Sequence, residues 1–261
     1  MASTAPAVGR FEIGGVVRRM VSGISANWQT LLVVALVTGA ISAAFTTLSM
    51  SQVMGLLDAA NPTAMLSMFT SPVYWLTMFG SMSVGTFSMG TMLGVLVRTE
   101  TGAAKIGSAF AVGLRCFLPM IALTILWILG LLVGYILLIV PAIILATMWS
   151  VAAPALVAER LNPVAAFGRS RALTKGIRWP VFGALLLFVI VYFVIAYGVQ
   201  GFSSTGMLSL YKSNVMAAMV IGMFSSSVLS ILTSAFLAGL YGEVLESKEG
   251  GSHSQLAEVF A

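Results

Sequence analysis

Residues 117–157 read FLPMIALTILWILGLLVGYILLIVPAIILATMWSVAAPALV and contain no charged side chain. One helix needs about 20 apolar residues to cross the hydrocarbon core of a bilayer, so this stretch is long enough for two crossings. Pro141 lies near its middle, and proline suits the first turn of a helix because its missing N–H leaves no donor unsatisfied there. We therefore predict a tight helical hairpin with spans over 117–138 and 141–157.

The rest of the chain contains four more apolar blocks, at 31–48, 73–97, 181–199 and 215–240. By the same length criterion each block is predicted to cross a membrane, which makes six transmembrane helices and an all-α integral membrane fold. Residues 1–245 are predicted to form a single domain, and residues 246–261 a polar cytoplasmic tail.

Two prolines bear on the hairpin helices. Pro154 lies inside the short fourth span, where a proline removes a backbone hydrogen bond and is expected to kink the helix. Pro119 is expected in the first turn of the third span, where proline is well tolerated.

The composition excludes an ordinary soluble domain. The chain is 59% hydrophobic and only 8% charged, whereas soluble domains carry about 25% charged residues. The formal net charge of +5 comes from cations that lie beside apolar blocks. A nucleic-acid-binding face needs a basic stripe on a folded polar surface instead, so we expect no nucleic-acid partner.

The cations alternate along the chain. Twelve of the thirteen Lys and Arg residues lie before the first block, between the second and third, between the fourth and fifth, or after the sixth. Cations near transmembrane segments are retained on the cytoplasmic side. The alternation predicts a multi-pass membrane protein with both termini in the cytoplasm. The cations expected to contact lipid headgroups are Arg18, Arg19, Arg171, Lys175 and Arg178.

A basic amphipathic helix is expected before each odd-numbered span. The best-defined one has Asn162 as N-cap, Pro163 as its first residue and Gly176 beyond its end. Residues 13–24 and 106–114 repeat the apolar periodicity before the first and third spans. Such helices lie in the headgroup plane or pack as connectors on neighbouring helices, and the pattern favours neither.

Small residues recur in two of the spans. In the sixth span they follow one another at four-residue steps, at Gly222, Ser226, Ser230, Ser234, Ala238 and Gly242. Gly90 and Gly94 form a shorter series in the second span. Small side chains let helix backbones approach closely in a membrane, so we expect the second and sixth spans to be central. The alternative is that the serines line a polar pathway.

The inventory of reactive side chains is small. His253 is the only histidine, in a tail rich in Gly and Ser. No cluster of His, Cys, Asp or Glu has the spacing of a metal site, and no serine has a histidine partner in the folded part of the chain. We therefore predict no catalytic residue, no metal site and no cofactor, and we do not expect an enzyme.

One stretch resembles a known family. Residues 149–159, WSVAAPALVAE, precede an Ala-aromatic-x-Arg-Ser helix and a Leu-Thr-x-Gly sequence. This pattern is similar to that of the bacterial membrane-domain family named after glycerophosphoryl diester phosphodiesterases. The residues that carry the resemblance are Pro154, Glu159, Arg169, Ser170, Gly176 and Trp179. The resemblance implies a six-helix module of the inner membrane. Some members of the family are fused to a phosphodiesterase barrel, which needs paired histidines, and this chain has only one histidine.

Within this motif, Glu159 and Arg169 are predicted to form an ion pair that ties the end of the fourth span to the following helix. An exposed pair contributes about 0–1 kcal/mol, and burial alters that value. We expect the pair to support the fold rather than to bind a ligand.

Two functions are consistent with these patterns. The first is a non-catalytic membrane protein that organises or contacts membrane lipid, partner proteins or further copies of the chain. The alternative is a transporter or lipid-translocating protein with a cavity between its helices. The absence of charged residues from the spans disfavours the alternative, because ion-coupled transport places ionisable groups inside the bundle.

Overall fold

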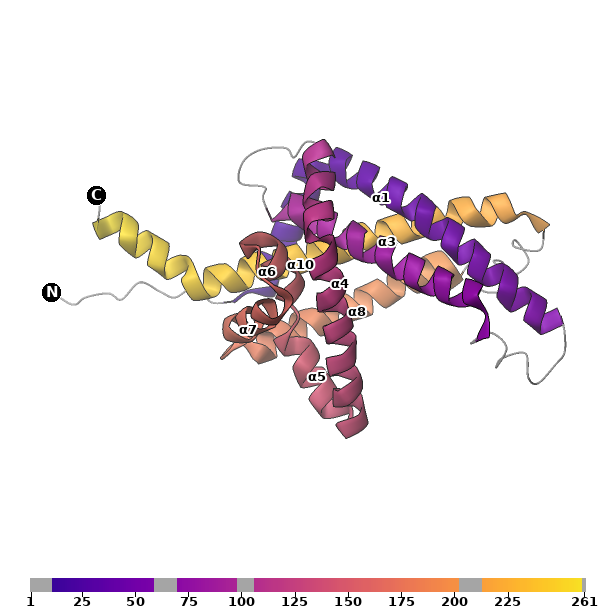
Figure 1. Ribbon diagram of the computed structural model, residues 1–261. Helices are drawn as coiled ribbons and strands as arrows, with labels where there is room; N and C mark the ends of the chain where they lie inside the picture. Colours follow the sequence, from indigo (N-terminus) through magenta and orange to yellow (C-terminus); the bar gives the residue numbers. More distant parts are fainter. Residues whose placement is uncertain (1–10, 59–69, 98–105, 202–212, 260–261) are drawn as a thin grey trace.

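The computed structural model describes residues 11–58, 70–97, 106–201 and 213–259 (Figure 1). These residues form helices and connecting turns, with no β-strand among them, so the predicted all-α fold is confirmed. The helices are α1 (Ile13–Asp58), α3 (Pro72–Leu96), α4 (Ile106–Leu137), α5 (Ile139–Met148), α6 (Ala152–Glu159), α7 (Pro163–Thr174), α8 (Arg178–Gly201) and α10 (Val215–Val259).

Six helical segments in these ranges are long and apolar enough to cross a membrane. Five of them lie in α1, α3, α4, α8 and α10, and the sixth, Ile139–Glu159, is made of α5 and α6 together. The number agrees with the six predicted spans. The chain is therefore a polytopic α-helical membrane protein.

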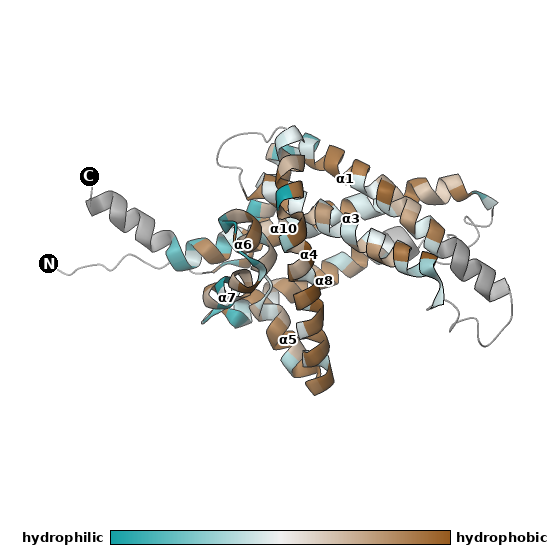
Figure 2. Cartoon of the chain, in the orientation of Figure 1, coloured by the Kyte–Doolittle hydropathy of each residue, from teal (hydrophilic) through white to brown (hydrophobic). Residues whose placement is uncertain are grey.

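The helices meet at one end of the molecule. Figure 1 shows α1, α3 and α10 running together, while the α4–α5 hairpin points in another direction. The start of α1 and the later part of α10 lie close to α6 and α7 (Figure 1). We call this region the charged end, because polar residues gather there whereas α5 and the part of α4 that joins it are apolar (Figure 2).

The predicted hairpin is present, with its turn at Leu138 between α4 and α5. Leu138 has φ 143° and ψ 158°, a backbone region that is normally occupied by glycine. Two glycines on α4 let the hairpin helices approach. A side chain at Gly130 would collide with the Trp149 ring, and one at Gly134 would lie 3.0 Å from the Cα atom of Ala142.

The expectation for Pro119 is wrong. The third approach helix and the third span form one continuous helix, α4, and Pro119 lies inside it rather than in its first turn. Buried residues lie on both sides of the proline, with Ala109 and Gly113 before it and Met120 and Leu123 after it. Packing along the whole helix therefore offsets the backbone hydrogen bond that the proline removes.

The expected kink near Pro154 appears as a complete break in the fourth span. α5 ends at Met148 and α6 begins at Ala152, which makes Pro154 the third residue of α6. A proline ring clashes with the carbonyl four residues earlier, which here belongs to Ser150, inside the break. A milder boundary occurs in α1, where Asn27 has non-helical φ and ψ values of −127° and 19°.

The buried core lies towards the charged end. The C-terminal half of α3 and the later part of α10 supply many of its residues, in line with the expected central position of these two spans. The sequence patterns did not single out α1, yet it packs closely along α10. A Cβ atom at Gly239 would lie 2.8 Å from the Val16 carbonyl oxygen, so this crossing requires glycine. α10 also continues past Leu240 through Val259, and three residues of the predicted tail contact the bundle: Ser247 is buried, and Glu246 and Glu249 pair with Arg19 and Arg169.

Candidate functional site: a charged cleft

Five glutamates have described side chains, and all five form ion pairs at the charged end. Their partners are three arginines: Arg18 and Arg19 at the start of α1, and Arg169 on α7. These residues form two clusters, one around Arg169 and one around Arg19, with a cleft between them.

The Arg169 cluster contains the predicted ion pair. The Arg169 Nε atom lies 2.8 Å from Glu159 Oε1 and 3.0 Å from Oε2, which confirms the contact between α6 and α7. The Nη1 atom of Arg169 binds Glu249 of α10 at 2.7 Å. The Tyr241 hydroxyl, also on α10, donates to Glu159 Oε1 at 2.8 Å. The pair predicted from the sequence is thus half of a four-residue cluster that joins three helices.

The Arg169 cluster keeps the Arg169 side chain protonated. Hydrogen bonding to Glu249, and then to Glu159, raises the pKa of Arg169, although burial acts in the opposite direction. A cation whose pKa is raised on folding stabilises the fold at every pH below its unfolded pKa, and for arginine it loses this contribution only in strongly alkaline solution. The guanidinium therefore stays protonated throughout the physiological pH range.

The Arg19 cluster joins α1 to α10. The Arg19 Nε atom lies 3.1 Å from Glu243 Oε2, and its Nη2 atom contacts Glu246 one turn later. The other oxygen of Glu243 accepts a hydrogen bond from the Glu12 backbone N–H at 3.2 Å. Arg18 lies on the outside, 3.7 Å from Glu12, with 78% of its side chain exposed. The sequence contains no local spacing that would predict these contacts.

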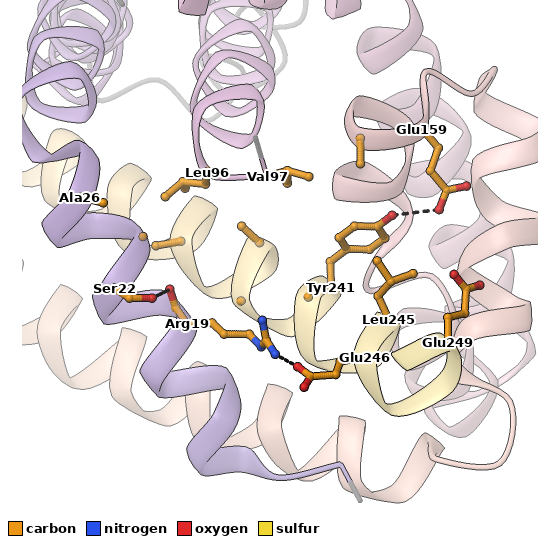
Figure 3. Close-up of a pocket in the computed structure, with 16 residues that line it drawn as sticks. Arg19, Ser22, Ala26, Leu96, Val97, Glu159, Tyr241, Leu245, Glu246 and Glu249 are labelled. Carbon is orange, nitrogen blue, oxygen red and sulfur yellow. Dashed lines mark hydrogen bonds and ion pairs between the residues drawn. The ribbon is translucent and has the colours of Figure 1, made fainter. Parts of the chain in front are cut away.

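Between the clusters lies a cleft of about 770 Å³, within the range of about 300–1,000 Å³ typical of ligand pockets. Figure 3 shows Arg19 and Glu246 on one side of it and Tyr241 and Glu159 on the other. Its apolar wall is made of small and aliphatic side chains from α1, α3, α6 and α10, among them Ala26, Leu96, Ala158, Ala235 and Ala238.

The residues of the family-like motif position α7. The Asn162 side chain accepts from the Ala165 N–H at 2.8 Å, so the predicted N-cap is confirmed. Ser170 is fully buried, and its hydroxyl donates to the Met148 carbonyl at 2.8 Å, which satisfies an acceptor left open at the end of α5. Gly176 has φ +86° just beyond α7. Pro154 is buried, whereas Trp179 is 83% exposed.

The small-residue series mainly serves helix packing. Ser230 bonds with Ser88 at 3.3 Å, and Ser88 bonds with Thr38 at 2.9 Å, so three hydroxyls connect α10, α3 and α1. Ser234 is buried, and Ser226 donates to a carbonyl of its own helix. Gly222 is partly buried towards the other end of α10. Ala238 and Gly242 line the cleft. Gly90 and Gly94 face Met120 and Val112 of α4.

The five predicted headgroup cations divide into two groups. Arg18 and Arg19 are paired with glutamates. Arg171 and Lys175 are exposed and form no ion pair within the described ranges. Arg178 is partly buried; its Nη2 atom lies 3.9 Å from Met148 Sδ, and its buried Nε atom has no hydrogen-bond acceptor in the described part of the chain.

The described side chains include no group of three or more His, Cys, Asp and Glu placed to hold a metal ion. The side chain of His253 lies outside the described part of the chain. Each described carboxylate is engaged with an arginine, so the arrangement at the charged end is one that holds helices together around a cleft.

No protein-family model, curated protein or solved structure matches the chain. The resemblance of residues 149–179 to a bacterial membrane-domain family therefore stays a prediction that rests on those residues alone. The function of the charged end is therefore inferred from the positions and contacts of its own residues.

Proposed function

We propose that this is a non-catalytic protein of a bacterial inner membrane that contacts membrane lipid, with its charged end and both termini in the cytoplasm. The observation that carries the proposal is the set of cations on α7, directly after it and at the start of α8 that form no ion pair with another described residue. They lie where the polar end of the molecule meets its long apolar helices.

The apolar helices present a surface suited to lipid. Large aliphatic side chains are exposed along α4, α5 and α8, with Leu118 at 76%, Ile136 at 74% and Val194 at 67% exposure. In water such a surface would be a liability, because soluble proteins rarely expose apolar patches larger than a few hundred Å². In a bilayer the same side chains face acyl chains at no cost.

The surface of α7 and the start of α8 combines two features that are typical of the membrane–water interface, an exposed tryptophan and exposed cations. Trp179 is 83% exposed at the first turn of α8, and tryptophan is enriched at headgroup level. Arg171 and Lys175 are exposed one helical turn apart on α7. Each such cation near an anionic membrane surface contributes about 1 kcal/mol of attraction. Because the described carboxylates bind other arginines, this attraction remains available for headgroups.

The lipid contact is tested by reconstituting the full chain in bilayers that mix phosphatidylglycerol with phosphatidylcholine. The relative association of spin-labelled phosphatidylglycerol should exceed that of phosphatidylcholine. It should fall towards equality in the double variant Arg171→Gln/Lys175→Gln. The matched control is Arg18→Gln/Arg19→Gln, which removes the same charge from cations already paired with glutamates. Equal losses in both variants would show that net charge alone is responsible and would contradict the proposed surface.

Lipid translocation is the second candidate, and the cleft of about 770 Å³ is the observation that favours it. Its described lining begins at Arg19 and ends at Ala26 on α1, and on α10 it begins at Ala235, so it lies at the charged end. A translocation pathway would need polar lining further along the same helices. Proteoliposomes with fluorescent phospholipid should therefore show no transfer above protein-free vesicles. Transfer that Ala238→Trp abolishes would favour the second candidate.

A further inference from the structure

A second cavity lies between α4 and the end of α6, beside the charged cleft. It has a volume of about 200 Å³ and is lined by Val112, Arg115, Cys116, Pro119, Leu156, Arg160 and Leu161. Two of these seven residues are arginines, and none is acidic. This composition differs from that of the charged cleft, where three carboxylates line the wall with one arginine.

Neither arginine of this cavity has its charge compensated within the described part of the chain. All ion pairs there involve Arg18, Arg19 or Arg169, and no hydrogen bond joins Arg115 or Arg160 to another described residue. Two like charges beside one cavity repel each other. An anion between them would remove that repulsion and engage the guanidinium donors, which match the oxygens of phosphate in geometry.

The backbone at Arg160 is unusual. Arg160 follows α6 with φ 54° and ψ 41°, the left-handed conformation in which a helix end normally carries glycine. A side chain at this position adds strain, because its Cβ atom crowds the backbone. The strain is compatible with a functional role for Arg160, which lines the cavity together with Arg115.

The rest of the cavity is apolar, and so is the surface next to it. Val112, Cys116, Pro119, Leu156 and Leu161 complete the wall. On α4, Leu118 is 76% exposed, and the residues after it contain no charge up to the hairpin turn. A ligand in this cavity would meet two cations at one end and a lipid-facing helix at the other.

We propose that this cavity binds the phosphate group of a membrane phospholipid, whose acyl chains lie along the exposed face of α4. The inference rests on the proposed function, since it assumes a bilayer around α4. The volume is below the range of about 300–1,000 Å³ for pockets that enclose whole drug-sized ligands, so it suits a phosphate group with the glycerol and chains outside. Inorganic phosphate shares the oxyanion chemistry but has no chains for the apolar surface.

The test measures lipid retention by native mass spectrometry on the full chain in nonionic detergent. Three probes are titrated separately: phosphatidylglycerol, diacylglycerol with the same acyl chains, and inorganic phosphate. One phosphatidylglycerol should be retained per chain, with about tenfold weaker retention of diacylglycerol. Arg115→Gln should weaken retention of phosphatidylglycerol by about the same factor. The control Lys248→Gln removes an exposed cation on α10 and should leave this retention unchanged.

A second variant separates binding from folding. Arg160→Gly removes the guanidinium and relieves the left-handed backbone, so the melting temperature should be equal to or higher than that of the original chain. Retention should nevertheless fall by about tenfold. Unchanged retention in both Arg115→Gln and Arg160→Gly would overturn the inference. So would inorganic phosphate binding as tightly as phosphatidylglycerol, because the site would then serve a free anion.

The outcomes also separate this inference from the proposed function. Suppose that the bilayer assay shows a preference for phosphatidylglycerol that depends on Arg171 and Lys175, while lipid retention in the mass spectrometer does not change in the Arg115 and Arg160 variants. Only the proposed phosphate site is then wrong. If neither the bilayer preference nor lipid retention is observed, the lipid contact itself is wrong, and the phosphate site fails with it.

Discussion

Arg169 and Arg19 each bind two glutamates, and both attach α10 to other helices, but their surroundings differ. The Arg169 and Glu159 side chains are each 28% exposed, and buried Tyr241 adds a third hydrogen bond to that pair. The Arg19 side chain is 41% exposed and its partner Glu246 is 60% exposed, whereas its other partner, Glu243, is only 12% exposed. Both side chains of the pair between Arg169 and Glu159 are thus partly desolvated, whereas Arg19 is more exposed and shares its charge between one exposed and one nearly buried glutamate.

This difference indicates that solvent exposure, more than the number of contacts, determines how much an ion pair contributes to the free energy of unfolding. Water and salt screen exposed pairs, whose contribution is typically about 0–1 kcal/mol. In a partly buried cluster, removal of one partner leaves the remaining charges without compensation, and that loss is larger. We infer that the Arg169 cluster anchors α10 to α6 and α7, whereas the Arg19 cluster is a weaker attachment to α1.

The largest expected effect comes from Arg169→Gln, which leaves Glu159 and Glu249 without their shared cation. Loss of one partner from a fully buried pair costs about 3–5 kcal/mol, and partial exposure should reduce this to about 2 kcal/mol in the free energy of unfolding. Unfolding of the purified chain in mixed micelles measures the change. A loss no greater than that of Arg19→Gln would break the proposed distinction between the clusters.

A smaller loss is expected for Glu159→Gln, about 1 kcal/mol, because Arg169 keeps Glu249 as a partner. The double variant with Arg169→Gln should lose less than the sum of the single losses, since the interaction can be removed only once. A double-mutant cycle from the same unfolding measurements gives the coupling. Additive losses would show that the contact between Glu159 and Arg169 makes no energetic contribution.

Tyr241→Phe isolates the hydrogen bond that the hydroxyl donates to Glu159. The ring remains in the core, so the expected loss is that of one hydrogen bond to a charged acceptor, typically about 1.5–3 kcal/mol, which the partial exposure of Glu159 should reduce to about 1 kcal/mol in the free energy of unfolding. In the Glu159→Gln background the same substitution should have less effect. An equal effect in both backgrounds would show that the hydroxyl stabilises the protein through a contact other than the one with Glu159.

The smallest effect is expected for Arg19→Gln, below about 1 kcal/mol, because the pair with Glu246 is exposed and screened and Glu243 keeps its hydrogen bond from the Glu12 N–H. The loss should shrink further as the salt concentration rises, whereas the loss in Arg169→Gln should change little. Melting curves of both variants at low and high salt provide this comparison. Equal salt dependence would mean that exposure does not distinguish the clusters.

Features that depend on neighbouring residues could be predicted from the sequence. The hairpin follows from a long uncharged stretch with a proline near its middle, and α7 begins at Pro163 because Asn162 directly before it caps the helix. The contact between Glu159 and Arg169 was also accessible, because its residues flank one short connection between α6 and α7.

Features that depend on residues far apart in the chain could not be predicted from the sequence. Arg19 meets Glu243 from the opposite end of the chain, and no periodicity indicates which face of α10 packs on α1. The hydroxyls of Thr38 and Ser88 likewise pair across helices. The two unpaired arginines of the smaller cavity, Arg115 and Arg160, were visible only as topology cations, since their shared position follows from the packing of α6 on α4.

The central claim is that six spans place the charged end on the cytoplasmic side of the membrane. The most direct test uses single cysteines in a Cys116→Ser background, at Ser71 and Ser213 near the starts of α3 and α10, and at Ala172 on α7. A membrane-impermeant maleimide added to intact cells should label positions 71 and 213, and position 172 only after permeabilisation. Labelling of position 172 in sealed cells, with positions 71 and 213 protected, would contradict the account.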